Sequence, residues 1–153
     1  MNVRLANIDD KQSVLALLDQ LGDEVNRTRG IFTPNTEAQT VGGPIFEEIL
    51  SRKDTLIFLA EEKEEIIGLA TFYILPIMRH GNYAGHIEEF IVDKVMRGKG
   101  IGTALFDAIK KYCKENNIKV IKLDSGIELT EAHKFYEKNG GKFTEMMFRF
   151  DIE

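Results

Sequence analysis

The chain has little of what metal-binding, disulfide-bonded and membrane proteins use. It is 153 residues long, yet it contains one cysteine, three histidines and no tryptophan. A single cysteine, Cys113, excludes an internal disulfide. The histidines lack ligand spacing with carboxylates, so we expect no metal site. No apolar run reaches the roughly 20 residues of a membrane-spanning helix.

The sequence also has no excess of basic residues, and its first residues do not follow the signal-peptide pattern. Its first residues, MNVRLANIDDKQ, contain no apolar core of the signal-peptide kind. With the lone cysteine, this favours a soluble protein of a reducing, cytoplasmic compartment. A net charge of -5 at pH 7 argues against nucleic-acid binding, which uses a basic footprint. We therefore expect neither nucleic acid nor membrane among the partners.

Ordinary globular composition and length predict one domain over residues 1–153. Alternating or continuous apolar patterns predict strands at 2–7, 55–62, 65–75, 86–93, 120–124 and 142–152. Helical periodicity predicts helices at 10–21, 44–52, 99–116 and 130–139. Segments 22–43 and 76–85 read as loops, which in a compact domain often serve a site.

The order of these elements predicts the fold class. A helix joins the strands expected at 86–93 and 120–124, which implies a parallel crossover. The other strands follow one another through short connections, as antiparallel strands do. We expect an α/β fold whose mixed sheet is mostly antiparallel with one parallel pair, with helices on both faces.

The segment RGKGIG, Arg97–Gly102, places three glycines between a strand and a helix. The first turn of a helix presents unbonded N–H groups and a positive dipole end, and glycine lets an anion approach them. Its spacing fits neither a Walker loop nor a dinucleotide fingerprint, which needs glycine where the chain has Thr103. A tight strand-to-helix turn without a ligand is the structural alternative.

This string fits [RQ]-x-x-G-x-[GA] and resembles the acetyl-CoA pyrophosphate loop of the GNAT N-acetyltransferase superfamily. The resemblance implies acetyl-CoA as co-substrate and no metal. It implies that the diphosphate is held by Arg97, Gly98, Lys99, Gly100, Ile101, Gly102 and Thr103. It also implies that the preceding strand splays from its parallel neighbour, so that the backbone of Phe90, Ile91 and Val92 binds the pantetheine arm.

Two further segments carry the resemblance. TEAHKFYEKNGG is similar to the family's A-x-x-F-Y-x-K-x-G run, which implies that Tyr136 protonates the departing thiolate. Simple core packing of this aromatic is the alternative. IEEFIV, residues 87–92, resembles the acidic strand of the spermidine/spermine N-acetyltransferases. On that resemblance Glu88 is the first candidate for the base that deprotonates the amine, and Glu89 has a structural or substrate-side role.

Strand alternation sends Glu88 to the face of His86, Phe90 and Val92, and Glu89 to the face of Ile87 and Ile91. His86 and a water molecule are the alternative bases, and both glutamates could instead be half-exposed edge residues. Candidates for binding the acceptor are Phe32, Tyr83, His86 and Glu89.

The resulting functional expectation is transfer of acetyl from acetyl-CoA to a primary amine by direct attack in a ternary complex. The acceptor would be a small molecule, such as a polyamine-like or amino-sugar amine. The alternatives are an acyl-CoA-binding sensor without turnover and a protein N-acetyltransferase. Homodimers are common among relatives, although the sequence itself does not show one.

Overall fold

The structure is a computed structural model that describes residues 1–152. The chain divides into two compact units, Met1–Leu123 and the segment from Asp124 onward. The first unit contains the whole sheet and four of the helices. A single domain over the full length therefore stays a prediction.

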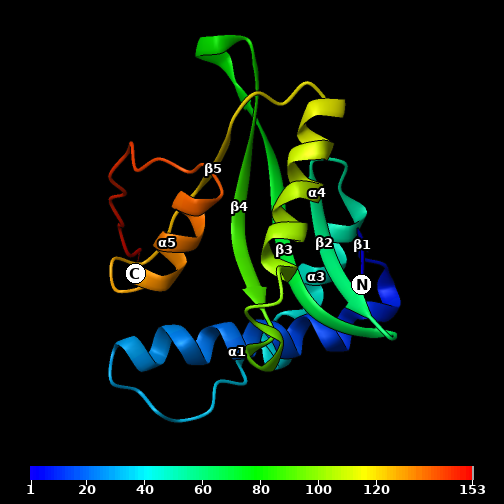
Figure 1. The fold of residues 1–153 in the computed structure, drawn as a ribbon, viewed down its shortest axis with the longest axis vertical. Coiled ribbons are helices and arrows are strands. Elements are labelled where there is room, and N and C mark those ends of the chain that lie inside the picture. Colours follow the sequence, from blue (N-terminus) through cyan, green and yellow to red (C-terminus); the bar gives the residue numbers. More distant parts are fainter. Residues whose placement is uncertain (153) are drawn as a thin grey trace. The chain divides into compact units, whose positions relative to one another are not determined.

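The first unit is built on a five-stranded sheet in the order β1-β2-β3-β4-β5 (Figure 1). The strands are β1 Asn2–Leu5, β2 Thr55–Glu62, β3 Glu65–Ile77, β4 Asn82–Val92 and β5 Ile121–Leu123. The first three neighbouring pairs are antiparallel, and β4 and β5 are parallel. The predicted mixed sheet with one parallel pair is confirmed.

Helices cover both faces of this sheet, as expected. They are α1 Lys11–Thr28, α2 Glu37–Val41, α3 Gly43–Ser51 and α4 Ile101–Glu115. α4 packs on one face, while α1 and α3 pack on the other. β2 reads as a continuous apolar run because neighbouring residues enter different cores: Phe58 faces α4 and Leu59 faces α1 and α3.

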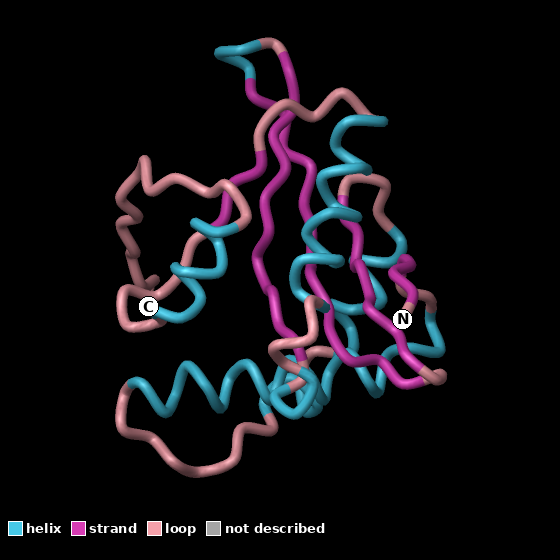
Figure 2. Tube along the Cα trace, viewed as in Figure 1, coloured by secondary structure: helices cyan, strands magenta, loops and turns pink. Residues whose placement is uncertain are grey.

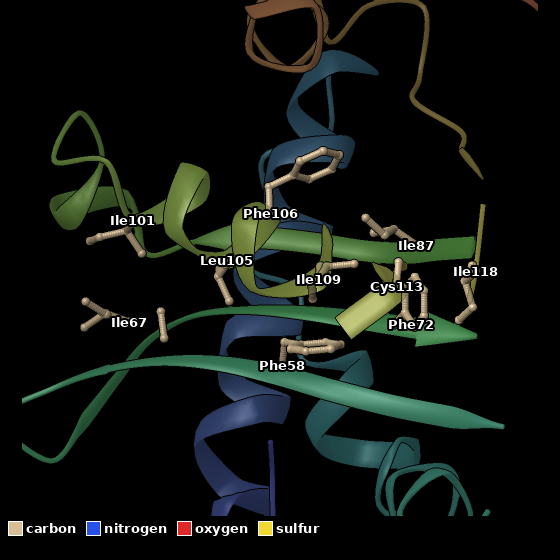
Figure 3. Packing of buried hydrophobic residues seen from close by; sticks show 12 residues of the cluster. Phe58, Ile67, Phe72, Ile87, Ile101, Leu105, Phe106, Ile109, Cys113 and Ile118 are labelled. Atoms are coloured by element: carbon tan, nitrogen blue, oxygen red, sulfur yellow. The ribbon is translucent and has the colours of Figure 1, made fainter. Parts of the chain in front are cut away.

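One apolar stripe attaches α4 to the sheet. Ile101, Leu105, Ile109 and Cys113 recur every four residues and are buried (Figure 3). Burial raises the pKa of the Cys113 thiol to about 11. A buried, protonated thiol is a poor nucleophile, so this cysteine serves packing.

The segment 22–43 is more ordered than the sequence predicted. α1 continues to Thr28, and α2 follows, which leaves residues 29–36 as the connection. Gly22 lies inside α1, where a Cβ would be 2.2 Å from Nδ2 of Asn35 in the returning chain. The expected loop was wrong because this glycine serves close packing rather than a turn.

The segment 76–85 is also mostly strand. β3 and β4 stay paired out to Ile77 and Asn82, and a short turn at Met78–His80 joins them (Figure 2). Gly81 completes this turn at φ 58°. Pro76 is tolerated because it lies beyond Tyr73, the last residue of β3 that pairs with β2.

In the second unit, α5 spans Thr130–Lys138 and ends where the Gly141 N–H donates to the Tyr136 carbonyl at 2.8 Å. The strand predicted at 142–152 is absent, because these residues pair with no strand of the described structure. Their apolar side chains are exposed, including Phe148 at 77%. Alternation made the segment strand-like, but a strand needs a partner for its backbone hydrogen bonds.

The contact between Gly85 and Phe72 gives a stability prediction. A Cβ at Gly85 would lie 2.2 Å from Cζ of Phe72, which is fully buried. We expect Gly85→Ala to lower the free energy of unfolding by about 1–3 kcal/mol through overpacking, as measured by urea denaturation.

The double variant Phe72→Leu/Gly85→Ala is the matched control. Because the smaller leucine vacates the space, its loss should be less than the sum of the two single losses. Strictly additive losses would contradict a direct clash.

Candidate active site

The site begins at a bulge in β4. Ala70 pairs with Phe90 and Phe72 pairs with Ile87, so Thr71 alone opposes both Glu88 and Glu89. A bulge of this kind re-aims the side chains that follow it. Ile87 therefore packs on the α4 face together with Phe90, although the two are three residues apart. The expectation that Glu89 shares a face with Ile87 was wrong because strict alternation does not survive the extra residue.

Thr71 satisfies the polar groups that the bulge exposes. Its buried hydroxyl accepts a hydrogen bond from the Glu89 N–H at 2.9 Å and donates one to the Glu89 carboxylate. Burial raises the pKa of the Glu89 carboxyl, the Thr71 hydrogen bond opposes that rise, and the charge of Glu88 adds to it. The result is a half-buried carboxylate of fixed direction that binds protons more readily than an ordinary glutamate.

Glu88 has different surroundings. Its side chain is 59% exposed, and one of its oxygens lies 2.9 Å from Nε2 of His86. The adjacent carboxylates are thus distinguished by environment, one solvated beside an imidazole and the other half-buried beside a hydroxyl.

A cavity of about 490 Å³ lies beside Glu89. Thr71, Tyr73 and Glu89 contribute from the sheet, and α1, α2 and α3 contribute mainly apolar side chains. Burial, followed by the charge of Glu89, raises the pKa of the Tyr73 phenol. The cavity therefore combines largely apolar helix walls with three polar side chains on the sheet side.

Of the sequence candidates for acceptor binding, Glu89 lines this cavity. His86 lies on β4 opposite Tyr73 and outside the lining. Tyr83 is near the far end of the β3–β4 hairpin and 53% exposed, and Phe32 is 79% exposed in the connection after α1. The structure does not bring Tyr83 or Phe32 to Glu89.

Sequence reasoning missed Thr71 and Tyr73. Both carry a hydroxyl in a strand that is otherwise apolar after Glu65, and their spacing of two puts them on one face. That signal was present in the sequence, but their proximity to Glu89 depends on the hairpin register and the bulge.

The glycine segment forms an open turn before α4. Gly98 and Gly100 adopt φ 77° and 80°, and a Cβ at either would meet no atom within 4 Å. Within residues 1–152, the backbone N–H groups from Gly100 to Thr103 donate no hydrogen bond, and the first such bond of α4 runs from Ala104 to the Gly100 carbonyl. Four successive donors thus remain for an external acceptor.

Two contacts tie this segment to α1. The Arg97 guanidinium pairs with Glu24 and donates through Nε to the Val92 carbonyl at 3.0 Å. The Lys94 N–H donates to the Gln20 side chain at 2.9 Å. Arg97 therefore has partners on α1 and β4 before any ligand is considered.

β4 separates from β5 close to the bulge. The parallel pairing ends at Ile87 and Leu123, while β4 continues to Val92. The N–H groups of Glu89 and Asp93 bond toward β3, and the Ile91 carbonyl lies against Gly68. By alternation, the backbone groups of Phe90 and Val92 turn toward the opposite edge, whereas those of Ile91 do not.

These features fit a diphosphate joined to an extended amide chain. The positive-φ glycines leave space where side chains would block phosphates, and the separated end of β4 offers a strand edge to an amide-rich arm. Among the described residues, no cluster of three or more potential metal ligands occurs. No described helix is long and apolar enough to span a bilayer.

Tyr136 lies in the second unit on α5. Burial raises the pKa of its phenol to about 12, so the hydroxyl is protonated at neutral pH.

Known proteins provide an independent comparison. The chain is 29% identical over 92 residues to the aminoalkylphosphonate N-acetyltransferase of Salmonella typhimurium, covering 60% of this chain and 58% of that protein. It is 32% identical over 99 residues to the glucosamine 6-phosphate N-acetyltransferase of Trypanosoma brucei brucei, covering 64% and 65%. The chain thus spans less than two thirds of the length of these two curated relatives.

A solved structure supports the fold. The crystal structure of a transcriptional regulator from Bacillus halodurans C-125 matches with a TM-score of 0.86 and 24% identity over 99% of both chains. The model of the acetyltransferase (GNAT) family matches residues 20–141, which include the bulge, the glycine turn and α5. The chain belongs to the acetyltransferase (GNAT) family.

Proposed function

We propose that the protein is an N-acetyltransferase that moves the acetyl group of acetyl-CoA to a small primary amine. The observation that carries this proposal is the arrangement along one strand of the first unit. The half-buried Glu89 carboxylate of β4 faces the cavity, and the same strand leads into a turn with four unbonded N–H groups, from Gly100 to Thr103. Membership of the family supports the reaction type.

The coenzyme supplies an activated acetyl group as a thioester. In the proposal, the Gly100–Thr103 amides hold its diphosphate, Gly98 and Gly100 leave room for it, and Phe90 and Val92 face its pantetheine arm. Arg97 exchanges or shares its contact with Glu24 when it meets the phosphates. Lys99 adds a positive charge beside them.

The amine carries a proton at neutral pH, since its pKa is about 10.4. We assign to Glu89 the tasks of holding the ammonium and accepting its proton directly or through water. The amine nitrogen then attacks the thioester carbonyl, the carbon–sulfur bond breaks, and the Tyr136 phenol donates a proton to the thiolate. The nitrogen, which carries one proton too many after the attack, releases it to water as the amide forms. Solvent then returns a proton to the Tyr136 phenolate and removes one from the Glu89 carboxyl.

Glu88 was the first candidate for the base, and that assignment stays a prediction. The contrast in surroundings favours Glu89, because an exposed carboxylate beside His86 lacks a fixed direction toward the cavity. Matched glutamine variants distinguish the two positions.

The coenzyme turn gives the first functional prediction. Saturating coenzyme A should slow amide hydrogen exchange at Gly100–Thr103, because the diphosphate would accept bonds from those N–H groups. Gly100→Ala should weaken coenzyme A binding about tenfold, the equivalent of about 1.4 kcal/mol, as measured by calorimetry. Its methyl group would enter the open space of the turn.

Gly81→Ala is the control for backbone strain. Gly81 also has a positive φ and open space around its Cβ position, but it lies in the β3–β4 turn. Equal effects of both variants, or unchanged exchange at Gly100–Thr103, would refute binding at the glycine turn.

The two glutamates give the second prediction. Glu89→Gln should lower kcat/KM by about 10²–10⁴-fold, the range of general base catalysis, whereas Glu88→Gln should leave it near wild type. Because the base acts when ionised, wild-type kcat/KM should rise with pH through the raised pKa of Glu89. That limb of the pH profile should be missing in Glu89→Gln.

Thermal unfolding shows whether a loss of activity in Glu89→Gln comes from the missing base or from a disrupted fold. Burial favours the protonated form of Glu89 in the native state and raises its pKa, so ionisation costs stability as pH rises through that pKa. Glu89→Gln should therefore have a Tm at pH 8 equal to or above wild type, with the difference shrinking toward pH 4. A lower Tm at pH 8 would mean that the variant disrupts the bulge. Full loss in Glu88→Gln instead would return the role to Glu88.

Tyr136 gives the third prediction. Tyr136→Phe should lower kcat about 10²-fold, the low end of acid catalysis, without changing the Kd for coenzyme A. Tyr112→Phe is the matched control, because the Tyr112 ring packs edge-on to Phe58 at 5.9 Å and only its hydroxyl is removed. Wild-type kcat in Tyr136→Phe would assign this residue to packing alone.

A further inference from the structure

The cavity beside Glu89 has apolar walls. Leu18, Leu21 and Val25 follow one face of α1 at helical spacing, and Val41 and Ile45 come from α2 and α3. Val41 and Ile45 are 60% and 57% exposed, so apolar surface continues to the rim. Its volume of about 490 Å³ falls within the roughly 300–1,000 Å³ of small-molecule sites.

The carboxylates that line the cavity differ in whether they can bind the ammonium of an acceptor. Asp19 is buried and accepts hydrogen bonds from the N–H groups of Ala38 and Gln39 at 2.7 and 3.2 Å, and from Nε2 of Gln39 at 2.8 Å. It therefore holds α2 against α1. Glu37 lies at the exposed start of α2, which leaves Glu89 as the carboxylate on the sheet side.

Positive groups do not line this cavity. Within the described chain, none of its lining residues is lysine, arginine or histidine. A phosphate or carboxylate on the acceptor would therefore lose its hydration without gaining a cationic partner, which is costly. A second ammonium would find Asp19 already bonded to α2, and the other lining carboxylate, Glu37, lies at the exposed start of α2 rather than among the apolar side chains.

We propose that the acceptor is a small primary amine with an uncharged, apolar body, whose ammonium binds Glu89 and whose body lies among the α1, α2 and α3 side chains. This inference rests on the acetyltransferase function proposed above and narrows it. It separates this protein from the two curated relatives, whose names specify a phosphonate and a phosphate on the acceptor.

A homologous amine series tests this substrate class. With acetyl-CoA and thiol detection, kcat/KM should rise from n-butylamine through n-pentylamine to n-hexylamine by about fourfold per methylene, the equivalent of about 0.8 kcal/mol. 2-Aminoethylphosphonate, glucosamine 6-phosphate and spermidine should react at least about tenfold less well than n-hexylamine, a gap of about 1.4 kcal/mol. Equal or faster turnover of any of these three would overturn the inference while leaving the acetyltransferase intact.

Calorimetry with the same amines tests the inference without turnover. If no amine releases coenzyme A thiol, the acetyltransferase proposal fails, yet the Kd of the alkylamines should still fall by the same factor per methylene. A Kd that does not change with chain length would overturn the apolar acceptor class.

A charge placed in the wall tests the location. Val25→Lys puts a cation on the cavity face of α1, so it should shift the kcat/KM ratio of glucosamine 6-phosphate to n-hexylamine at least about tenfold toward the phosphate. Ala16→Lys adds the same charge at an exposed position of α1 outside the cavity and should leave the ratio unchanged. The same shift in both variants, or in neither, would contradict binding in this cavity. Thermal unfolding checks that both variants fold.

Discussion

At Glu88 and Glu89, two residues of β4 stand opposite a single residue of β3, and the Thr71 hydroxyl supplies both hydrogen bonds that this mismatch requires. Without the bulge, residue 89 would keep the facing of Ile87, on the side covered by α4. With it, the carboxylate turns to the cavity side, where burial raises its pKa. The Thr71 hydroxyl thus fixes the direction of the Glu89 carboxylate and bonds its N–H group, while burial sets the direction of the pKa shift.

The rest of the first unit is arranged around this point. β4 leaves its parallel partner after Ile87, so the strand edge opens next to the bulge and leads directly to the glycine turn. α1 carries cavity side chains on one face and Gln20 and Glu24, which contact the segment before α4, on another. Residues of α1 therefore contact both the cavity and the segment that leads to the glycine turn.

Local signals predicted local structure well. Three features depend only on residues close together in the sequence and were predicted from it: the apolar stripe of α4, the continuous apolar run of β2 and the glycine turn. The bulge was not, because it depends on how many residues of β4 face Thr71 of another strand. The end of the first helix was mispredicted at Gly22 for a similar reason, since the residue packed against this glycine, Asn35, lies in the returning chain. The alternation at 142–152 describes a strand that could form, but a sequence pattern does not provide the neighbour that would pair with it.

Cys113 has a practical consequence. It is the sole thiol of the chain, it is 3% exposed on the face of α4 that packs on the sheet, and its pKa is raised to about 11, so reagents that detect thiolates meet almost none on the folded protein. Colour formed during a reaction at 25 °C would then report the released coenzyme with negligible protein background. The same reagent, added during heating without coenzyme, would report when α4 lifts from the sheet. Cys113, which we assign to packing, thus reports opening of the core through the exposure of its thiol.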